Sequence, residues 1–441
     1  MIRKTGWMLM ASLLWAQVPA EMEKSVAAQE KHLIDTFKTI HQNPELGFME
    51  KQTSALVAKE LKALGYKVIT GVAKTGVVGI LENGKGPVIM FRADMDANAV
   101  KEVTGLPYAS SKTVTREDGE TVPVMHACGH DAHTTWLLGI AKTMKELKSR
   151  WHGTLVVVFQ PAEELIEGAR AMAAELYKKG TPKPDVLITM HTAPIPTGTV
   201  VLAEGERMAG TDQIDVTFYG VGGHGSTPHL AKDPVMMAAS AVVQYQFIIS
   251  RAIDAQHAAV LTVGSIQAGS DNNVIPSTAL LKLNLRWFDE KDRKIMIDAI
   301  KRINDSVAYA YGMPKEKYPK MKQKGWAKPV VNDPALVKAA RPALTEVFGD
   351  KGVLDKAPRS MGSEDFHHLV IDNTGAKYLH LFIGTADPNV FAKAQKEGKA
   401  VPFANHNGNF VVDPKAIPLA VKAGSNLLLH FFNDPSAIKG K

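Results

Sequence analysis

The sequence lacks three features that would assign it to a well-defined class. It has one cysteine in 441 residues, Cys128, so an intramolecular disulfide is impossible. Its formal charge of +7 is spread along the chain without a long basic run, whereas a nucleic-acid surface needs a concentrated basic stripe. Beyond the N-terminal region, no apolar run reaches the roughly 18 residues of a membrane-spanning helix. We expect no nucleic-acid partner and, after N-terminal processing, no membrane association.

The N-terminus has the pattern of a secretory signal peptide. Arg3 and Lys4 precede an apolar stretch over residues 7–15, and Val18-Pro19-Ala20 places small residues at positions −3 and −1 of a cleavage site. Residues 1–20 are therefore predicted to be removed, and the mature protein to be secreted, or periplasmic if the source is a Gram-negative bacterium. An uncleaved anchor is the alternative. A lone thiol in such an oxidising compartment is a liability unless it is buried or holds a metal.

The chain is longer than one hydrophobic core usually organises, and its 45% apolar and 22% charged residues are typical of a soluble globular protein. Apolar runs at 88–91, 155–159 and 186–190 indicate buried strands. Helical spacing predicts one helix over 136–147, and a second helix is predicted to follow Glu164 and to end at Gly180, a plausible C-terminal cap. Continuous apolar strands that alternate with helices predict an α/β domain with a mixed, largely parallel sheet.

The pattern changes near residue 207. Ile214, Val216 and Phe218 alternate with polar residues; a helix over 234–250, strands over 258–266 and 279–287, and a helix ending near Tyr311 are then predicted. This β-α-β-β-α order resembles a ferredoxin-like sandwich. Because α/β segments resume after a Pro- and Lys-rich stretch, we predict an insertion at 207–317 within a catalytic domain formed by 21–206 and 318–441.

Two short segments carry the chemistry of a metal site, Met125–His133 and Gln160–Glu164. Thiolate, imidazole and carboxylate groups bind Zn²⁺ and similar ions, and a further carboxylate can act as a general base. Each predicted strand is followed by such groups: Asp94 and Asp96, then Glu163 and Glu164, then His191. Open α/β sheets bind ligands beyond the carboxyl ends of their strands, so one shared crevice is expected. Chance placement of polar residues in loops is the alternative.

Seven motifs occur in the order found in the M20 metallopeptidase family, at residues 41–48, 92–96, 128–130, 160–164, 222–224, 273–276 and 362–366. Over about residues 30–430 the chain resembles this family, above all its amidohydrolase branch of hippurate hydrolases, aminoacylases and auxin-conjugate hydrolases. The resemblance implies a zinc-peptidase-like catalytic domain with two divalent metal ions per subunit, Zn²⁺ or Mn²⁺, with Co²⁺ or Ni²⁺ also compatible. It further implies a ferredoxin-like lid domain that mediates assembly into a homodimer or tetramer.

The family's metal ligands correspond to Cys128, His130, Glu164, His191 and His406, with Cys128 as a possible bridge between the two ions. From the residues alone, His191 could be a core histidine and His406 a surface one.

The remaining site residues also come from the resemblance. Glu163 matches the general base, Asp96 an aspartate that orients a ligand, and His224 a histidine that reaches the neighbouring subunit's metal centre. Asn273 and Arg286 match lid residues that hold substrate. As alternatives, Glu163 could cap a helix, His224 could lie in an ordinary turn, and Arg286 could be a solvated strand residue.

The implied activity is hydrolysis of the amide bond of N-acyl amino acids or short peptides by a metal-bound hydroxide, with a glutamate as general base. A catalytically inactive metal- or ligand-binding protein of the same fold and a cysteine nucleophile are the competing hypotheses.

The chain departs from the branch pattern at Asn98-Ala99, at Gly225-Ser226-Thr227 and at Ser363. These departures spare the implied ligands, but they alter loops expected to touch substrate.

Overall fold

The computed structural model describes residues 18–116 and 119–439, so the apolar stretch of the predicted signal peptide lies outside the described residues. The chain forms two compact units. The first comprises the residues up to Gly205, together with Asn332–Pro358 and the chain from Phe366 onward, and the second comprises Glu206–Val331 and Arg359–Asp365. In the part of the chain that is described, no helix is both long enough and apolar enough to cross a bilayer.

The first unit is built on an eight-stranded sheet in the order β1-β2-β6-β3-β7-β18-β8-β17. The four strands β6, β3, β7 and β18 run parallel, whereas the pairs β1–β2, β2–β6 and β18–β8 are antiparallel. The mixed, largely parallel sheet is thereby confirmed. Its strands are Lys67–Val72 (β1), Gly76–Asn83 (β2), Val88–Asp94 (β3), Gly153–Gln160 (β6), Val186–Pro196 (β7), Val200–Val201 (β8), Val353–Leu354 (β17) and Lys377–Ala386 (β18).

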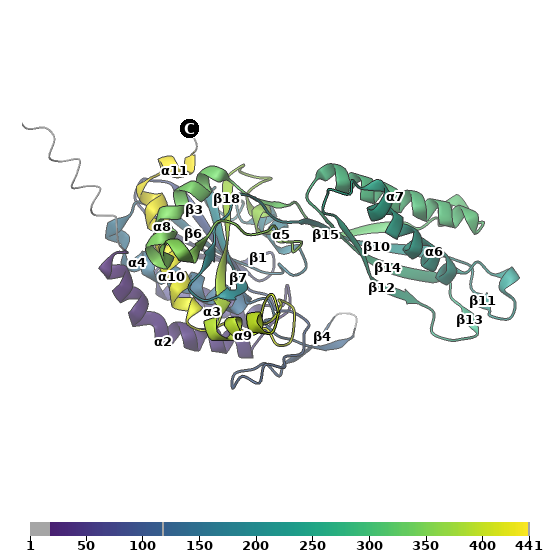
Figure 1. The fold of residues 1–441 in the computed structure, drawn as a ribbon, viewed down its shortest axis with the longest axis horizontal. Coiled ribbons are helices and arrows are strands. Elements are labelled where there is room, and N and C mark those ends of the chain that lie inside the picture. Colours follow the sequence, from purple (N-terminus) through teal and green to yellow (C-terminus); the bar gives the residue numbers. More distant parts are fainter. Residues whose placement is uncertain (1–17, 117–118, 440–441) are drawn as a thin grey trace, which may run out of the picture. The chain divides into compact units, whose positions relative to one another are not determined.

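Helices cover this sheet because its central strands are apolar on both faces. Four of them form a packed group, in which three contact strands of the sheet and the fourth, the first in sequence, packs on two of the others (Figure 1). They are α2 (Ala20–Gln42), α4 (His130–Glu146), α8 (Pro334–Gly352) and α10 (Ala416–Asn433). The other helices of the unit are α3 (Lys51–Ala63), α5 (Gly168–Glu175), α9 (Pro388–Lys396) and α11 (Ser436–Lys439).

The helix predicted from Glu164 to Gly180 is shorter than expected, since α5 spans only Gly168–Glu175. Before it, Ala162 and Ile166 have positive φ angles of 51° and 55°, which no α-helix accommodates. Glu163 and Glu164 therefore lie in an irregular loop.

The second unit is a four-stranded antiparallel sheet in the order β12-β14-β10-β15, on which two helices pack (Figure 1). Its elements are β10 (Gly210–Tyr219), α6 (Pro234–Phe247), β12 (Val260–Ala268), β14 (Thr278–Trp287), α7 (Glu290–Ala310) and β15 (Lys320–Ala327). This order and topology are those of a ferredoxin-like sandwich. A two-stranded ribbon, β11 (Gly223–His224) with β13 (Val274–Ile275), belongs to the same unit.

The insertion extends beyond residue 317, where the sequence pattern placed its end. Strand β15 pairs with β10 from Thr217↔Lys320 to Thr211↔Ala327 and supplies the last strand of the β-α-β-β-α-β motif. Arg359–Asp365 also belongs to the second unit, a return of the chain that the sequence did not predict.

Candidate metal centre

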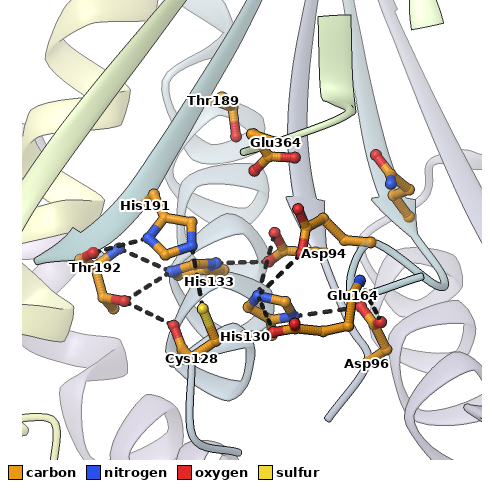
Figure 2. A network of polar contacts seen from close by, with 12 residues as sticks. Asp94, Asp96, Cys128, His130, His133, Glu164, Thr189, His191, Thr192 and Glu364 are labelled. Atoms are coloured by element: carbon orange, nitrogen blue, oxygen red, sulfur yellow. Dashed lines mark hydrogen bonds and ion pairs between the residues drawn. The ribbon is translucent and has the colours of Figure 1, made fainter. Parts of the chain in front are cut away.

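Polar residues at and just beyond the carboxyl ends of β3 and β6 meet His191, which lies inside β7 rather than after it (Figure 2). Two hydrogen bonds hold the ends of β3 and β6 together. The Met95 N–H donates to the Gln160 carbonyl over 2.9 Å, and the Glu164 N–H donates to Asp96 Oδ2, also over 2.9 Å. Potential ligand atoms from the three strand regions therefore lie close together in the first unit.

The five residues that match metal ligands lie together there. Cys128 Sγ lies 3.6 Å from His191 Nε2, and ligand atoms of Cys128, Glu164 and His406 lie within 4.8 Å of one another. Glu164 Oε1 lies 3.7 Å from His130 Nε2 and 3.2 Å from His406 Nε2. The Glu164 carboxylate thus lies between the His130 and His406 imidazoles.

Backbone contacts bring these side chains to one place. Gly129 has a φ of +83°, and a Cβ there would come within 2.7 Å of the Thr192 side chain, so glycine is required where the chain turns into α4. The Thr192 hydroxyl donates to the Cys128 carbonyl over 2.8 Å. On the other side, the His406 N–H donates to the Ala127 carbonyl over 2.8 Å. Residues far apart in sequence are fixed around Cys128 in this way.

Two histidines direct Nε2 into the cluster. His191 Nδ1 lies 2.8 Å from the Thr192 carbonyl and donates to it, which leaves Nε2 as the nitrogen that faces the Cys128 sulfur. His130 Nδ1 lies 3.3 Å from Asp96 Oδ1. Its Nε2 is buried without a hydrogen-bond partner among the described residues, although carboxylate oxygens surround it at 3.6–3.9 Å. A metal ion would satisfy this nitrogen, and the donor set fits one.

The electrostatics of the cluster also fit a cation. Burial and the charge of Glu164 each tend to raise the pKa of the Cys128 thiol, but the His191 and His130 imidazoles outweigh them and lower it to about 5. Contacts with Cys128 and Glu164 raise the pKa of His406 to about 10. Thiolate and carboxylate groups are thus concentrated in a buried space, where uncompensated negative charge is costly.

Glu163 lies next to the cluster. Its Oε2 is 3.9 Å from His130 Nε2, and its side chain is buried. Helix α5 begins at Gly168 and has no side-chain cap, so capping of that helix does not explain Glu163.

The predicted substrate-side residues belong to the second unit. His224 on β11 is exposed, and its Nδ1 lies 2.7 Å from Ser226 Oγ. Asn273, also exposed, directly precedes the Val274 that pairs with His224. Arg286 lies on β14, in the four-stranded sheet. The unit thus brings His224 and Asn273 side by side on its ribbon.

Sequence reasoning did not assign site roles to Asp94 and His133. Asp94 accepts from His133 Nδ1 over 2.5 Å and from Arg92 Nη1 over 2.8 Å. His133 Nε2 accepts the Thr192 N–H over 2.9 Å, so both of its ring nitrogens are engaged. His133 therefore supports the cluster rather than adding an imidazole ligand. Its position three residues after His130, on the same face of α4, was the available sequence signal.

Comparison with known proteins gives consistent results. The model of peptidase family M20/M25/M40 matches residues 90–397. Hippurate hydrolase of Campylobacter jejuni is 37% identical over 353 residues, which cover 77% of this chain and 88% of that protein. N-acetyl-L-cysteine deacetylase of Bacillus subtilis is 36% identical over 348 residues, covering 78% and 79%. The solved structure of the Bacillus subtilis YXEP protein, described as a dinuclear metal-binding peptidase of family M20, has a TM-score of 0.69 and 26% identity, and the match covers 92% and 99% of the two chains.

Proposed function

We propose that this chain, which belongs to peptidase family M20/M25/M40 and is a metal-dependent amide hydrolase, cleaves N-acyl amino acids or short peptides that carry a free carboxylate. One observation carries the proposal: the five potential ligands come from distant parts of the chain and lie together, and the Glu163 carboxylate lies beside them, 3.9 Å from His130 Nε2. Two relatives, named for hydrolysis of hippurate and of N-acetyl-L-cysteine, suggest N-acyl amino acids as the substrate class.

The site is suited to two divalent ions, Zn²⁺ or Mn²⁺, held by Cys128, His130, Glu164, His191 and His406. When bound, such ions polarise the amide carbonyl and lower the pKa of water. The anionic donors would balance their charge, and Cys128, a soft ligand near both His191 and Glu164, would help to hold them.

Glu163 is the proposed general base. Its carboxylate would accept a proton from the attacking water and pass it to the leaving amine. Asp96 would keep His130 oriented, because its Oδ1 faces Nδ1 of that ring.

The second unit would bind the substrate and assemble the oligomer. Arg286 would bind the substrate carboxylate, Asn273 would hold the amide, and His224 of one subunit would stabilise the developing oxyanion in its neighbour.

A homodimer is supported by apolar side chains exposed on α6, where Val243 is 63% and Phe247 58% exposed. It is supported also by β12, an edge strand with unpaired backbone groups.

Export is the proposed location. The basic residues Arg3 and Lys4, the apolar stretch and the small residues before position 21 support secretion, or transfer to a periplasm. The N-terminal sequence of the mature protein would test the cleavage site.

Metal removal tests the activity. The purified chain is treated with a chelator, dialysed, and reloaded with Zn²⁺, Mn²⁺ or Co²⁺. It is then assayed on hippurate, N-acetyl amino acids and dipeptides, with the corresponding carboxyl amides as matched controls. We expect activity only after reloading, and a raised KM for the carboxyl amides. Activity that persists without metal, or no hydrolysis of any of these amides by the reloaded protein, would contradict the proposal.

A further inference from the structure

Glu50 is a buried carboxylate outside the metal cluster. Its side chain is fully shielded from solvent at the start of α3, and it belongs to the segment that follows the 41–48 motif. Neither metal binding nor substrate binding, as proposed above, explains why an acidic group is buried there. A buried carboxylate is costly unless donors satisfy it, so its partners indicate its role.

Those donors come from three separate parts of the chain. Oε1 accepts the Ala162 N–H over 2.8 Å and the Phe48 N–H over 3.0 Å. Oε2 accepts the Thr75 hydroxyl over 2.6 Å. Glu50 therefore ties its own segment and the β1–β2 turn to the residue that immediately precedes Glu163.

Ala162 has a backbone conformation that requires support. Its φ is +51°, in the left-handed region that residues with a Cβ disfavour. Its N–H is held by Glu50, and its carbonyl accepts the Gly168 N–H over 3.1 Å, so both flanking peptide groups are fixed. Gly47 packs closely on it, since a Cβ at Gly47 would come within 3.0 Å of the Ala162 Cα.

We propose that Glu50 is a positioning residue that holds Ala162 in the left-handed conformation and thereby directs Glu163 and Glu164 into the metal cluster. The direction of the chain after Ala162 depends on its φ and ψ, so relaxation towards the right-handed region would turn both glutamates away. The catalytic part of this inference rests on the proposed function of Glu163, whereas the conformational part does not.

The test compares Glu50→Ala and Glu50→Gln in full-length, metal-loaded protein, each with and without Ala162→Gly. We expect Glu50→Ala to lower kcat about 10²-fold, as expected for a misplaced catalytic group, with KM changed less than about threefold. Glu50→Gln retains an oxygen that accepts the Ala162 N–H, so its kcat should fall less than about tenfold. Glycine adopts positive φ freely, so Ala162→Gly should restore kcat of the Glu50→Ala protein by about tenfold.

A second readout does not depend on turnover. Hydrogen–deuterium exchange of residues 160–168 should rise in Glu50→Ala, and metal affinity should fall, because Glu164 is a proposed ligand. Glu45→Gln is the matched control, because the carboxylate of Glu45 is also buried and accepts the Gln52 and Thr53 N–H groups of α3. Because the described hydrogen bonds of the Glu45 carboxylate go to α3, this variant should leave both kcat and the exchange of 160–168 unchanged.

If Glu50→Ala does not fold, Gly47→Ala provides a perturbation that leaves the carboxylate in place. It should lower kcat by displacing Ala162, and Ala162→Gly should relieve the effect. The proposal is overturned if kcat of Glu50→Ala stays within about threefold of the wild type, or if Ala162→Gly restores nothing and exchange at 160–168 is unchanged. Full activity of Glu163→Gln together with raised exchange in Glu50→Ala would instead refute the assignment of Glu163 and leave the positioning role of Glu50 intact.

Discussion

The surroundings of His41 predict that the free energy of unfolding depends measurably on pH. Its imidazole, 3% exposed, lies between two carboxylates, with Nδ1 2.6 Å from Asp131 Oδ2 and Nε2 3.2 Å from Glu102 Oε1. Burial alone would lower the pKa of His41, but the hydrogen bonds and charges of Asp131 and Glu102 outweigh burial and raise it from 6.5 to about 9. The folded protein therefore holds a proton on His41 that the unfolded chain releases near pH 6.5.

The sign and size of the effect follow from linkage. Between pH 6.5 and 9 the folded state binds more protons at this site than the unfolded state, so the free energy of unfolding falls as pH rises. The contribution is complete below pH 6.5 and is lost above pH 9. A shift of that size corresponds to about 3 kcal/mol, at roughly 1.4 kcal/mol per pKa unit.

The assay is urea unfolding of chelator-treated protein at pH 6 and at pH 9.5, for the wild type and for His41→Gln. The difference in unfolding free energy between the two proteins should shrink by about 3 kcal/mol from the lower to the higher pH. His32→Gln on the same helix is the matched control: His32 is exposed and pairs with Glu60 at 3.3 Å, and such pairs contribute at most about 1 kcal/mol. The same pH dependence in the wild type and in His41→Gln would refute this interpretation of the buried cation.

Three further predictions concern catalysis and assembly. Glu163→Gln should lower kcat by about 10²–10⁴-fold with metal content near normal, and substantial residual activity would remove Glu163 as the base. His224→Ala should have a similar effect on turnover, and mixing it with Glu163→Gln subunits should partly restore activity; no restoration in confirmed mixed dimers would indicate a site within one chain. Val243→Lys combined with Phe247→Glu should shift the protein towards a monomer in light scattering, whereas an unchanged mass would place the interface elsewhere.

Much of the fold was predictable because its signal is local. The strands at 88–91, 155–159 and 186–190 are short continuous apolar runs, and the structure extends each of them by a few residues. The ferredoxin-like order was visible from alternating and helical periodicities. Strand β15 was missed because lysine and glutamine occupy four of its eight positions, as is common for an edge strand, so it has no clear apolar alternation.

The candidate ligands were predictable for a different reason. Cys128, His130 and Glu164 are residue types that bind metals, and they lie in motifs whose order along the chain is visible without coordinates. Which nitrogen of His191 faces inward was not visible, because that depends on the contact of its Nδ1 with the Thr192 carbonyl. Likewise, the sequence does not distinguish His133 from the candidate ligands. The distinction comes from the Thr192 N–H, which donates to His133 Nε2.

The sequence by itself determined the central strands and the order of the motifs that hold the candidate metal ligands, since each depends on neighbouring residues or on motif order. Only the tertiary structure decided the roles of Glu50 and His41. Nothing near them in sequence marks either side chain as buried, and their partners Ala162 and Asp131 lie about a hundred residues away along the chain. The cost of burying a charge is offset by donors and acceptors that only the folded chain brings together.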